Sequence, residues 1–108
     1  MSDFFYPKDG PKNFQKLMAL KKDLFNSFVT FDQKVFEEGT LSVKVKELVA
    51  VACAHITRCP YCIDNHIQKA KQAGATDEEI AEVIFVAMAM SAGASLAHSC
   101  ISMESLNR

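Results

Sequence analysis

The sequence lacks an excess of charge of either sign. Its 108 residues include 12 Lys and Arg against 13 Asp and Glu, which gives a formal net charge of −1 at pH 7. Proteins that bind nucleic acid or anionic membranes usually carry a basic patch, so this balance argues against both partners. Apolar residues make up 49% of the chain and charged residues 23%, as in a soluble globular protein. The length suits one domain, and we expect residues 1–108 to form it.

We also expect no secretion signal and no membrane-spanning segment. Residues 1–4 do not have the basic and then apolar layout of a signal peptide. The longest apolar stretches, Leu48–Ala54 and Ile84–Met90, are much shorter than the roughly 20 residues that a transmembrane helix needs. We therefore expect a cytoplasmic protein with no membrane partner. Cytoplasmic thiols are normally reduced, so a Cys-x-x-Cys motif there indicates redox chemistry or metal binding rather than a structural disulfide.

Repeats and low-complexity segments are absent, and no segment alternates apolar and polar residues with the period of a strand. We therefore assign no strands. Apolar residues recur at helical spacing from Asn13 to about Glu38, with a break expected near Thr30–Asp32 and an end at Gly39. Before this region, prolines and a glycine interrupt an aromatic segment, so we expect residues 1–12 to form an extended arm.

Three residues mark the ends of the next two helices. Ser42 is the expected N-cap of a helix over residues 43–57, most of which we expect to be buried. Pro60 suits the first turn of the following helix, because proline is tolerated there. Gly74 suits the position just after the end of that helix.

The last predicted helix runs from Asp77 towards Met103. It begins with a capping box formed by Thr76 and Glu79. Its middle, residues 87–94, is small and largely apolar on all sides, so we expect it to be buried. The sequence thus predicts an all-α, antiparallel bundle of about five helices with short connections. Its apolar content also favours a homo-oligomer.

The most informative stretch is Cys59-Pro60-Tyr61-Cys62, followed by His66. If Pro60 opens a helix, Cys59 is its N-cap and Cys62 lies in its first turn, so the two sulfurs can be bridged. His66 lies four residues after Cys62, on the same helix face. The spacing brings together a nucleophile, a base and a second thiol, which reversible dithiol–disulfide chemistry requires. The alternative is a helix start that carries two cysteines by chance.

Two physical effects favour different nucleophiles. The amides and dipole of a helix N-terminus stabilise a thiolate most strongly at Cys59, whereas the base His66 lies beside Cys62. Zinc binding is another alternative, with these three side chains and Glu47 or His55 as ligands. Zinc sites usually draw ligands from separate elements, so this reading is less favoured, and we predict no metal and no cofactor.

Glu47 is a carboxylate at the edge of an apolar helix surface, where its charge needs a partner. Lys44 and Arg58 can neutralise it, or it can take a proton from the dithiol through His66. A rise of about 1.5 Å per residue places Glu47 and His66 several ångströms apart in a simple antiparallel hairpin. A bridging water or a tilted crossing would close that gap.

The remaining cysteines and histidines receive structural interpretations. Cys53 and Cys100 lie in apolar helical segments and are expected to be buried core thiols. His55 is expected to cap or pack rather than to act on Cys59. His98 follows the small-residue segment and is assigned no chemistry.

Together these residues resemble the signature of AhpD-like alkylhydroperoxidases, which belong to the carboxymuconolactone decarboxylase superfamily. The signature, E-x11-C-x-x-C-x3-H, is matched by Glu47, Cys59, Cys62 and His66. The resemblance covers roughly residues 40–100. It extends to the flanking residues Lys44–Ala52, Asn65, Gly74–Thr76 and Glu78–Ile80.

The resemblance implies an all-α fold, assembly as a trimer or hexamer, and an antioxidant peroxidase activity. By position, Cys62 would be the peroxidatic thiolate and Cys59 the resolving thiol of a redox-active disulfide. His66 would relay the proton and Glu47, through water, would be the base. The substrate would be a hydroperoxide or a small disulfide. A thioredoxin-like or lipoyl-bearing protein would supply electrons as the external dithiol donor.

One residue departs from the pattern of some peroxidase members, which carry His immediately before the second cysteine. Tyr61 stands there, and its hydroxyl can make a hydrogen bond but is a poorer base near neutral pH. A general thiol–disulfide oxidoreductase is therefore an alternative function. A non-redox carboxymuconolactone decarboxylase is a weaker one, because that branch does not depend on a Cys-x-x-Cys pair.

Overall fold

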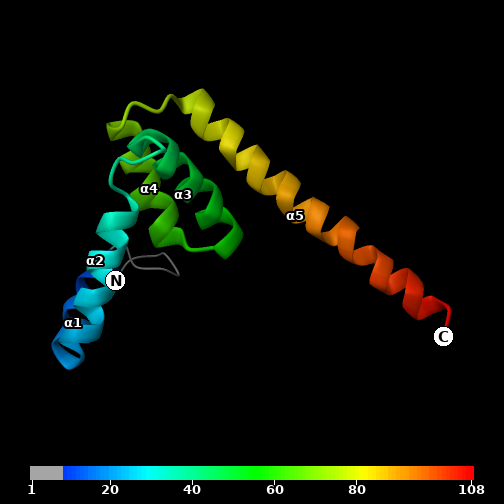
Figure 1. Cartoon of the computed structure of the whole chain (residues 1–108), viewed down its shortest axis with the longest axis horizontal. Helices are drawn as coiled ribbons and strands as arrows, with labels where there is room; N and C mark the ends of the chain where they lie inside the picture. The colour runs from blue at the N-terminus through cyan, green and yellow to red at the C-terminus, as the bar shows by residue number, and fades with distance from the viewer. Residues whose placement is uncertain (1–8) are drawn as a thin grey trace.

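The computed structural model describes residues 9–108, and this part of the chain is helical with no strand. Figure 1 shows a helical body from which a long helix leaves as a rod that ends at the C-terminus. The elements are η1 (Gly10–Asn13, a 3-10 helix), α1 (Phe14–Leu20), α2 (Lys22–Val35), α3 (Val43–Thr57), α4 (Pro60–Gln72) and α5 (Asp77–Leu106). The all-α prediction with about five helices is confirmed.

Helices α3 and α4 form a hairpin that is the centre of the body (Figure 1). Ser42 caps α3, with its hydroxyl accepting from the Val45 amide at 3.2 Å. Arg58 then takes the left-handed conformation (φ 60°) and Cys59 is extended, so the chain reverses within two residues. Pro60 is the first residue of α4, where its missing amide hydrogen costs no helical bond. The predicted helix starts are therefore confirmed.

The core lies where the first turns of α5 pack against α3 and α4. Gly74 follows α4 with φ 97°, a conformation that favours glycine. The predicted capping box then starts α5, with the Glu79 amide donating to Thr76 at 3.1 Å and the Thr76 amide donating to Glu79 at 2.9 Å. The buried cluster consists of Val51, Ala70, Ala75 and Ile80, with Leu48, Ile67, Val83 and Ile84 packed around it.

The rest of α5 contradicts the expectation of a buried helix. Its buried residues are Ile80 and Ala87, and beyond them it extends away from the body (Figure 1). The radius of gyration, 18.0 Å, exceeds the roughly 13 Å of a compact 100-residue domain. No other part of residues 9–108 covers this apolar surface. The exposed large apolar residues of α5 are Phe85, Val86, Met88, Met90, Leu96, Ile101, Met103 and Leu106.

The length of α5 removes one reason for expecting no membrane partner. Residues 83–103 contain no Asp, Glu, Lys or Arg, and the helix is long and apolar enough to cross a membrane by length and composition. Counting uninterrupted apolar stretches missed this because serines, glycine and His98 divide the run. The absence of a membrane partner stays a prediction.

The N-terminal helices differ from the predicted pattern at both ends. The break lies at Lys21 (φ −145°, ψ 68°), where α1 turns to pack on α2, and not near Thr30–Asp32. Lys21 is not a helix breaker, so no residue type marks this break. Helix α2 ends at Val35, four residues before the expected end at Gly39. Phe36 is its C-cap. Most of the predicted arm lies outside the described residues, but residues 10–12 belong to η1 and are not extended.

Candidate functional site

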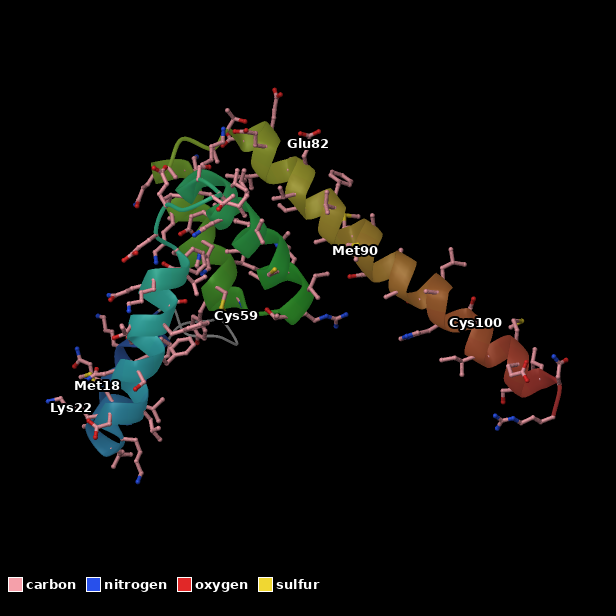
Figure 2. The ribbon with its side chains drawn as sticks, viewed as in Figure 1. Met18, Lys22, Cys59, Glu82, Met90 and Cys100 are labelled. Atoms are coloured by element: carbon pink, nitrogen blue, oxygen red, sulfur yellow. A yellow bond between two sulfur atoms is a disulfide. The ribbon has the colours of Figure 1, made fainter. Side chains whose placement is uncertain are left out.

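The dithiol lies at the turn of the α3–α4 hairpin, as predicted. Cys59 is the N-cap of α4, and its sulfur accepts from the Cys62 amide at 3.2 Å. The two residues form a disulfide, with their Cα atoms 5.2 Å apart, within the usual range for such a bridge. Figure 2 places Cys59 at the end of the hairpin, remote from Met90 and Cys100 on α5. One helix turn is therefore sufficient to hold the pair in bonding geometry.

Glu47 and His66 are in direct contact across the hairpin. The His66 Nδ1 and Glu47 Oε1 atoms are 2.6 Å apart, and the two side chains are 16% and 5% exposed. The expected gap of several ångströms between Glu47 and His66 is absent, because both side chains reach across it. The bridging water that was considered for this gap is not needed.

The contact determines which His66 nitrogen is available for chemistry. An ionised carboxylate only accepts hydrogen bonds, so Nδ1 carries the hydrogen and donates it to Glu47. In the neutral ring, Nε2 then has a free lone pair and can take a proton. The Glu47 carboxylate lies against the other edge of the ring, at Nδ1, and both side chains are largely shielded from water.

The alternative partner proposed for Glu47 is occupied elsewhere. The Lys44 ammonium lies 2.8 Å from Glu79 Oε2, which links α3 to the start of α5. This interaction and the amide of Thr76 lower the pKa of Glu79 below its ordinary value, with the Lys44 hydrogen bond as the larger cause. Arg58, the other candidate, is exposed at the C-cap of α3. The structure thus pairs Glu47 with His66, while Lys44 pairs with Glu79.

Two residues that the sequence did not single out also belong to the site. The Phe36 ring stacks on the His66 ring, with centroids 5.1 Å apart and an interplanar angle of 22°. The Lys46 ammonium donates to the backbone carbonyls of Val35 at 2.8 Å and Glu37 at 2.5 Å. In the sequence, Phe36 is one of several helically spaced phenylalanines, and nothing there distinguishes it.

A cavity of about 480 Å³ opens beside Cys62 and His66. Its size is within the usual range for small-molecule sites. Of the cysteine pair, Cys62 is the one that lines this space. Most of the lining is apolar and comes from α2, α3 and the segment between them. The lining residues are Asp32, Val35, Phe36, Leu41, Lys46, Val49, Ala50, Cys53, Ala54, Thr57, Cys62 and His66.

The other cysteines are exposed, which contradicts the prediction of buried core thiols. Cys53 lies on the face of α3 that lines the cavity, and Cys100 lies on the projecting part of α5. The error has the same cause as for α5, namely that these apolar faces are not covered by the chain itself. His55 Nδ1 donates to the Val51 carbonyl, one turn earlier on α3, at 2.8 Å. His98 is exposed.

Tyr61 faces the N-terminal 3-10 helix. A Cβ atom built on Gly10 would lie 2.7 Å from the Tyr61 hydroxyl oxygen, so only glycine fits at position 10 without displacing the ring. Tyr61 thus packs against η1 in addition to standing between the two cysteines. Within residues 9–108, no group of three or more His, Cys, Asp or Glu side chains is arranged to hold a metal ion.

The geometry agrees with the comparison to known families. A family model for the carboxymuconolactone decarboxylase family matches residues 22–104. The chain belongs to the carboxymuconolactone decarboxylase family. The resemblance inferred from the Glu47–His66 signature is thereby confirmed at the level of the superfamily. The match begins at the first residue of α2, so it includes this helix and its C-cap, Phe36.

Solved structures support the same assignment to the carboxymuconolactone decarboxylase family. A family member from Legionella pneumophila, solved in its apo form, is 33% identical with a TM-score of 0.73 and covers 90% of this chain and 87% of its own. A protein from Methanobacterium thermoautotrophicum is 32% identical with a TM-score of 0.74, and the match covers 79% of this chain and 96% of that one.

Two curated relatives are described as uncharacterized. Protein 4 in the cox locus of Paracoccus denitrificans is 46% identical over 74 residues, which is 68% of this chain and 67% of that protein. A protein of Cupriavidus necator is 39% identical over 57 residues, and the match spans half of its length. Neither relative assigns an activity, so the activity has to be inferred from the site.

Proposed function

We propose that this family member is a Cys-x-x-Cys-dependent peroxidase that reduces hydroperoxides through a Cys59–Cys62 dithiol–disulfide cycle. The observation that carries the proposal is the 2.6 Å contact between His66 and Glu47 beside the cavity that Cys62 lines. It supplies a base next to the thiol that faces the cavity. Cys59, whose sulfur accepts from the Cys62 amide and does not line the cavity, takes the role of the resolving thiol.

In the first half of the cycle, His66 Nε2 takes the proton of the Cys62 thiol. The thiolate attacks the distal oxygen of the hydroperoxide, so a sulfur–oxygen bond forms and the oxygen–oxygen bond breaks. Cys62 is oxidised to a sulfenic acid, and the leaving alkoxide receives the proton held by His66 and departs as an alcohol. Glu47 stabilises the imidazolium between these two transfers.

In the second half, the Cys59 thiolate attacks the Cys62 sulfur. The disulfide forms, the sulfur–oxygen bond breaks and the hydroxide takes up the proton that the Cys59 thiol has released, so that it leaves as water. The bridge between Cys59 and Cys62 corresponds to this oxidised state. An external dithiol, carried by a thioredoxin-like or lipoyl protein, restores both thiols by two exchange steps and is itself oxidised to a disulfide.

The cavity favours an organic hydroperoxide over hydrogen peroxide. Its volume of about 480 Å³ and apolar lining residues such as Val35, Leu41 and Val49 can bury an alkyl or aryl group. Hydrogen peroxide has no apolar group to bury there. We therefore expect a lower KM for bulky organic hydroperoxides.

We further propose that the active protein is a homo-oligomer, a trimer or hexamer, that covers the apolar face of α5. Leu96 is 75% exposed and Met90 65% exposed, on a helix whose residues 83–103 carry no acidic or basic residue other than His98. A soluble monomer rarely exposes a continuous apolar surface of this kind. Light scattering on the purified chain should give three or six times the monomer mass.

The peroxidase proposal is tested with two single serine variants and a remote control. Cys62→Ser should abolish hydroperoxide turnover. Cys59→Ser should accumulate a Cys62 sulfenic acid that a dimedone-type reagent traps. Glu82→Gln, which changes an exposed carboxylate outside the apolar stretch of residues 83–103, should turn over at the wild-type rate. Turnover by the Cys59→Ser/Cys62→Ser double variant at the wild-type rate would exclude the proposal.

The second candidate, a disulfide reductase on the same dithiol, is favoured by one observation. Tyr61 occupies the position of a family histidine and packs against η1, so one base of the peroxidase pattern is replaced. Faster oxidation of the reduced protein by a small disulfide than by any hydroperoxide would favour this candidate. The non-redox decarboxylase is less consistent with the site, since it has no use for the cysteine pair.

A further inference from the structure

His66 is held by a hydrogen bond on one edge and by an aromatic ring on one face. The bond from Nδ1 to Glu47 fixes the distance between the two groups but leaves the imidazole free to rotate about the bond axis. The Phe36 ring removes that freedom, because its plane is within 22° of the imidazole plane at a centroid distance of 5.1 Å. The two contacts together fix the direction in which Nε2 points.

Phe36 is in turn held by a charged side chain. It is the C-cap of α2, where the last backbone carbonyls of the helix have no intrahelical partner. Lys46 supplies that partner by donating to the carbonyls of Val35 and Glu37, the residues on either side of Phe36. A positive charge at this position also suits the negative end of the helix dipole. The end of α2 is thereby pinned to α3, next to Glu47 in sequence.

We propose that Phe36 and Lys46 are positioning residues for the His66 base. Lys46 holds the end of α2 in place by its two hydrogen bonds. Phe36 then stacks on the imidazole and orients it so that Nε2 points towards Cys62. The inference rests on the proposed role of His66 in the reaction. It adds that the α2–α3 junction, outside the Glu47–His66 signature, controls the reactivity of the dithiol.

Both residues also line the cavity. If this were their only role, their substitution would weaken substrate binding and raise KM. If the two residues orient His66, their substitution should lower kcat with little change in KM, since misplacement of a catalytic group by about 1 Å can lower the rate about 100-fold. The orientation of His66 also controls how fast the Cys62 thiol reacts in the absence of any peroxide.

The first readout needs no peroxidase activity. Reduced protein is treated with iodoacetamide at neutral pH, and peptide mass spectrometry follows Cys62 separately from the exposed Cys53 and Cys100. Phe36→Leu should slow alkylation of Cys62 about tenfold, because it keeps an apolar side chain but removes the flat face. Phe36→Tyr, which retains the ring, should restore the rate to within about twofold.

The second readout is the NMR signal of the His66 ring. The chain has three histidines, so these signals are few enough to assign by substitution. In the wild type, the stacked Phe36 ring should shift the His66 ring protons upfield, and Phe36→Leu should remove that shift. Lys46→Met should reduce it in part, while Lys46→Arg should preserve it because the guanidinium can still donate to both carbonyls.

The matched control is Lys44→Met, which removes a lysine from the same helix but one that is bound to Glu79. It should leave Cys62 alkylation and the His66 signal unchanged. The double variant Phe36→Leu/Lys46→Met should be no slower than the slower single variant, because both act through one contact.

Two results would overturn the proposal. One is an unchanged His66 signal together with wild-type Cys62 alkylation in Phe36→Leu that is folded by circular dichroism. The other is a raised KM at constant kcat in both Phe36→Leu and Lys46→Met. Failure of the wild type to reduce any hydroperoxide would instead contradict the proposed function, and the alkylation and NMR results would still decide the positioning role.

Discussion

Replacing Glu47 with Gln tests the proton relay at the point where the structure is most specific. The substitution keeps the size of a side chain that is 5% exposed and removes the charge that His66 Nδ1 contacts at 2.6 Å. The amide oxygen of Gln can still accept the hydrogen of Nδ1, so the neutral imidazole keeps its orientation. The change is confined to the stabilisation of the imidazolium.

The magnitude follows from the loss of a charged hydrogen-bond partner in a buried site. A hydrogen bond to a charged group contributes about 1.5–3 kcal/mol and a neutral one about 0.5–1.5 kcal/mol, so loss of the charge alone removes about 1–1.5 kcal/mol. If that stabilisation is lost where His66 holds the thiol proton, the rate falls about 5- to 12-fold, since about 1.4 kcal/mol corresponds to a factor of ten. Glu47→Ala should also lower stability, because it leaves His66 without its partner beside an empty space.

The assay is the rate of Cys59–Cys62 disulfide formation in reduced protein mixed with an organic hydroperoxide, measured by rapid quench and thiol counting. The control is Glu82→Gln, which neutralises an exposed carboxylate on α5 and should oxidise at the wild-type rate. Folded Glu47→Gln that forms the disulfide as fast as the wild type would refute the relay.

Three further predictions concern other parts of the molecule. Gly10→Ala should lower the melting temperature, because its Cβ would lie 2.7 Å from the Tyr61 hydroxyl, and Tyr61→Phe should partly restore it by removing that oxygen. Lys44→Met should raise the pKa of Glu79 in an NMR titration, since the Lys44 hydrogen bond is the main cause of its lowering. The folded-state pKa of Glu79 lies below the unfolded one, so the stabilisation is present above the unfolded pKa and is lost as the pH falls through the folded one; Lys44→Met should weaken this dependence. Leu96→Glu should convert the oligomer to a smaller species in light scattering, because it places a charge on the apolar face of α5.

Features set by local chemistry could be predicted from the sequence. Ser42, Pro60 and the Thr76 capping box each act within a few residues, and each begins a helix where expected. The Cys59–Cys62 spacing belongs to the same class, because one helix turn brings both sulfurs together. For such features the sequence neighbours are also the spatial neighbours.

Features that depend on distant contacts were not predicted. Phe36 stacks on His66 although the two residues lie in segments that are far apart in the sequence. Nothing in the spacing of the phenylalanines distinguishes Phe36 from the others. The exposure of α5 and Cys53 depends on what covers a helix face, and an apolar pattern does not say whether the cover is this chain or another. The Glu47–His66 contact was found from spacing, but the reach of the side chains decided that it is direct.

The most direct test of the peroxidatic dithiol is intact mass spectrometry of the reduced protein, before and after one equivalent of an organic hydroperoxide. We predict a rapid loss of two hydrogens, mapped to a Cys59–Cys62 disulfide and absent from Cys62→Ser. An unchanged mass in protein whose cysteine pair is still oxidised readily by a disulfide reagent would contradict the peroxidase and assign the site to thiol–disulfide exchange.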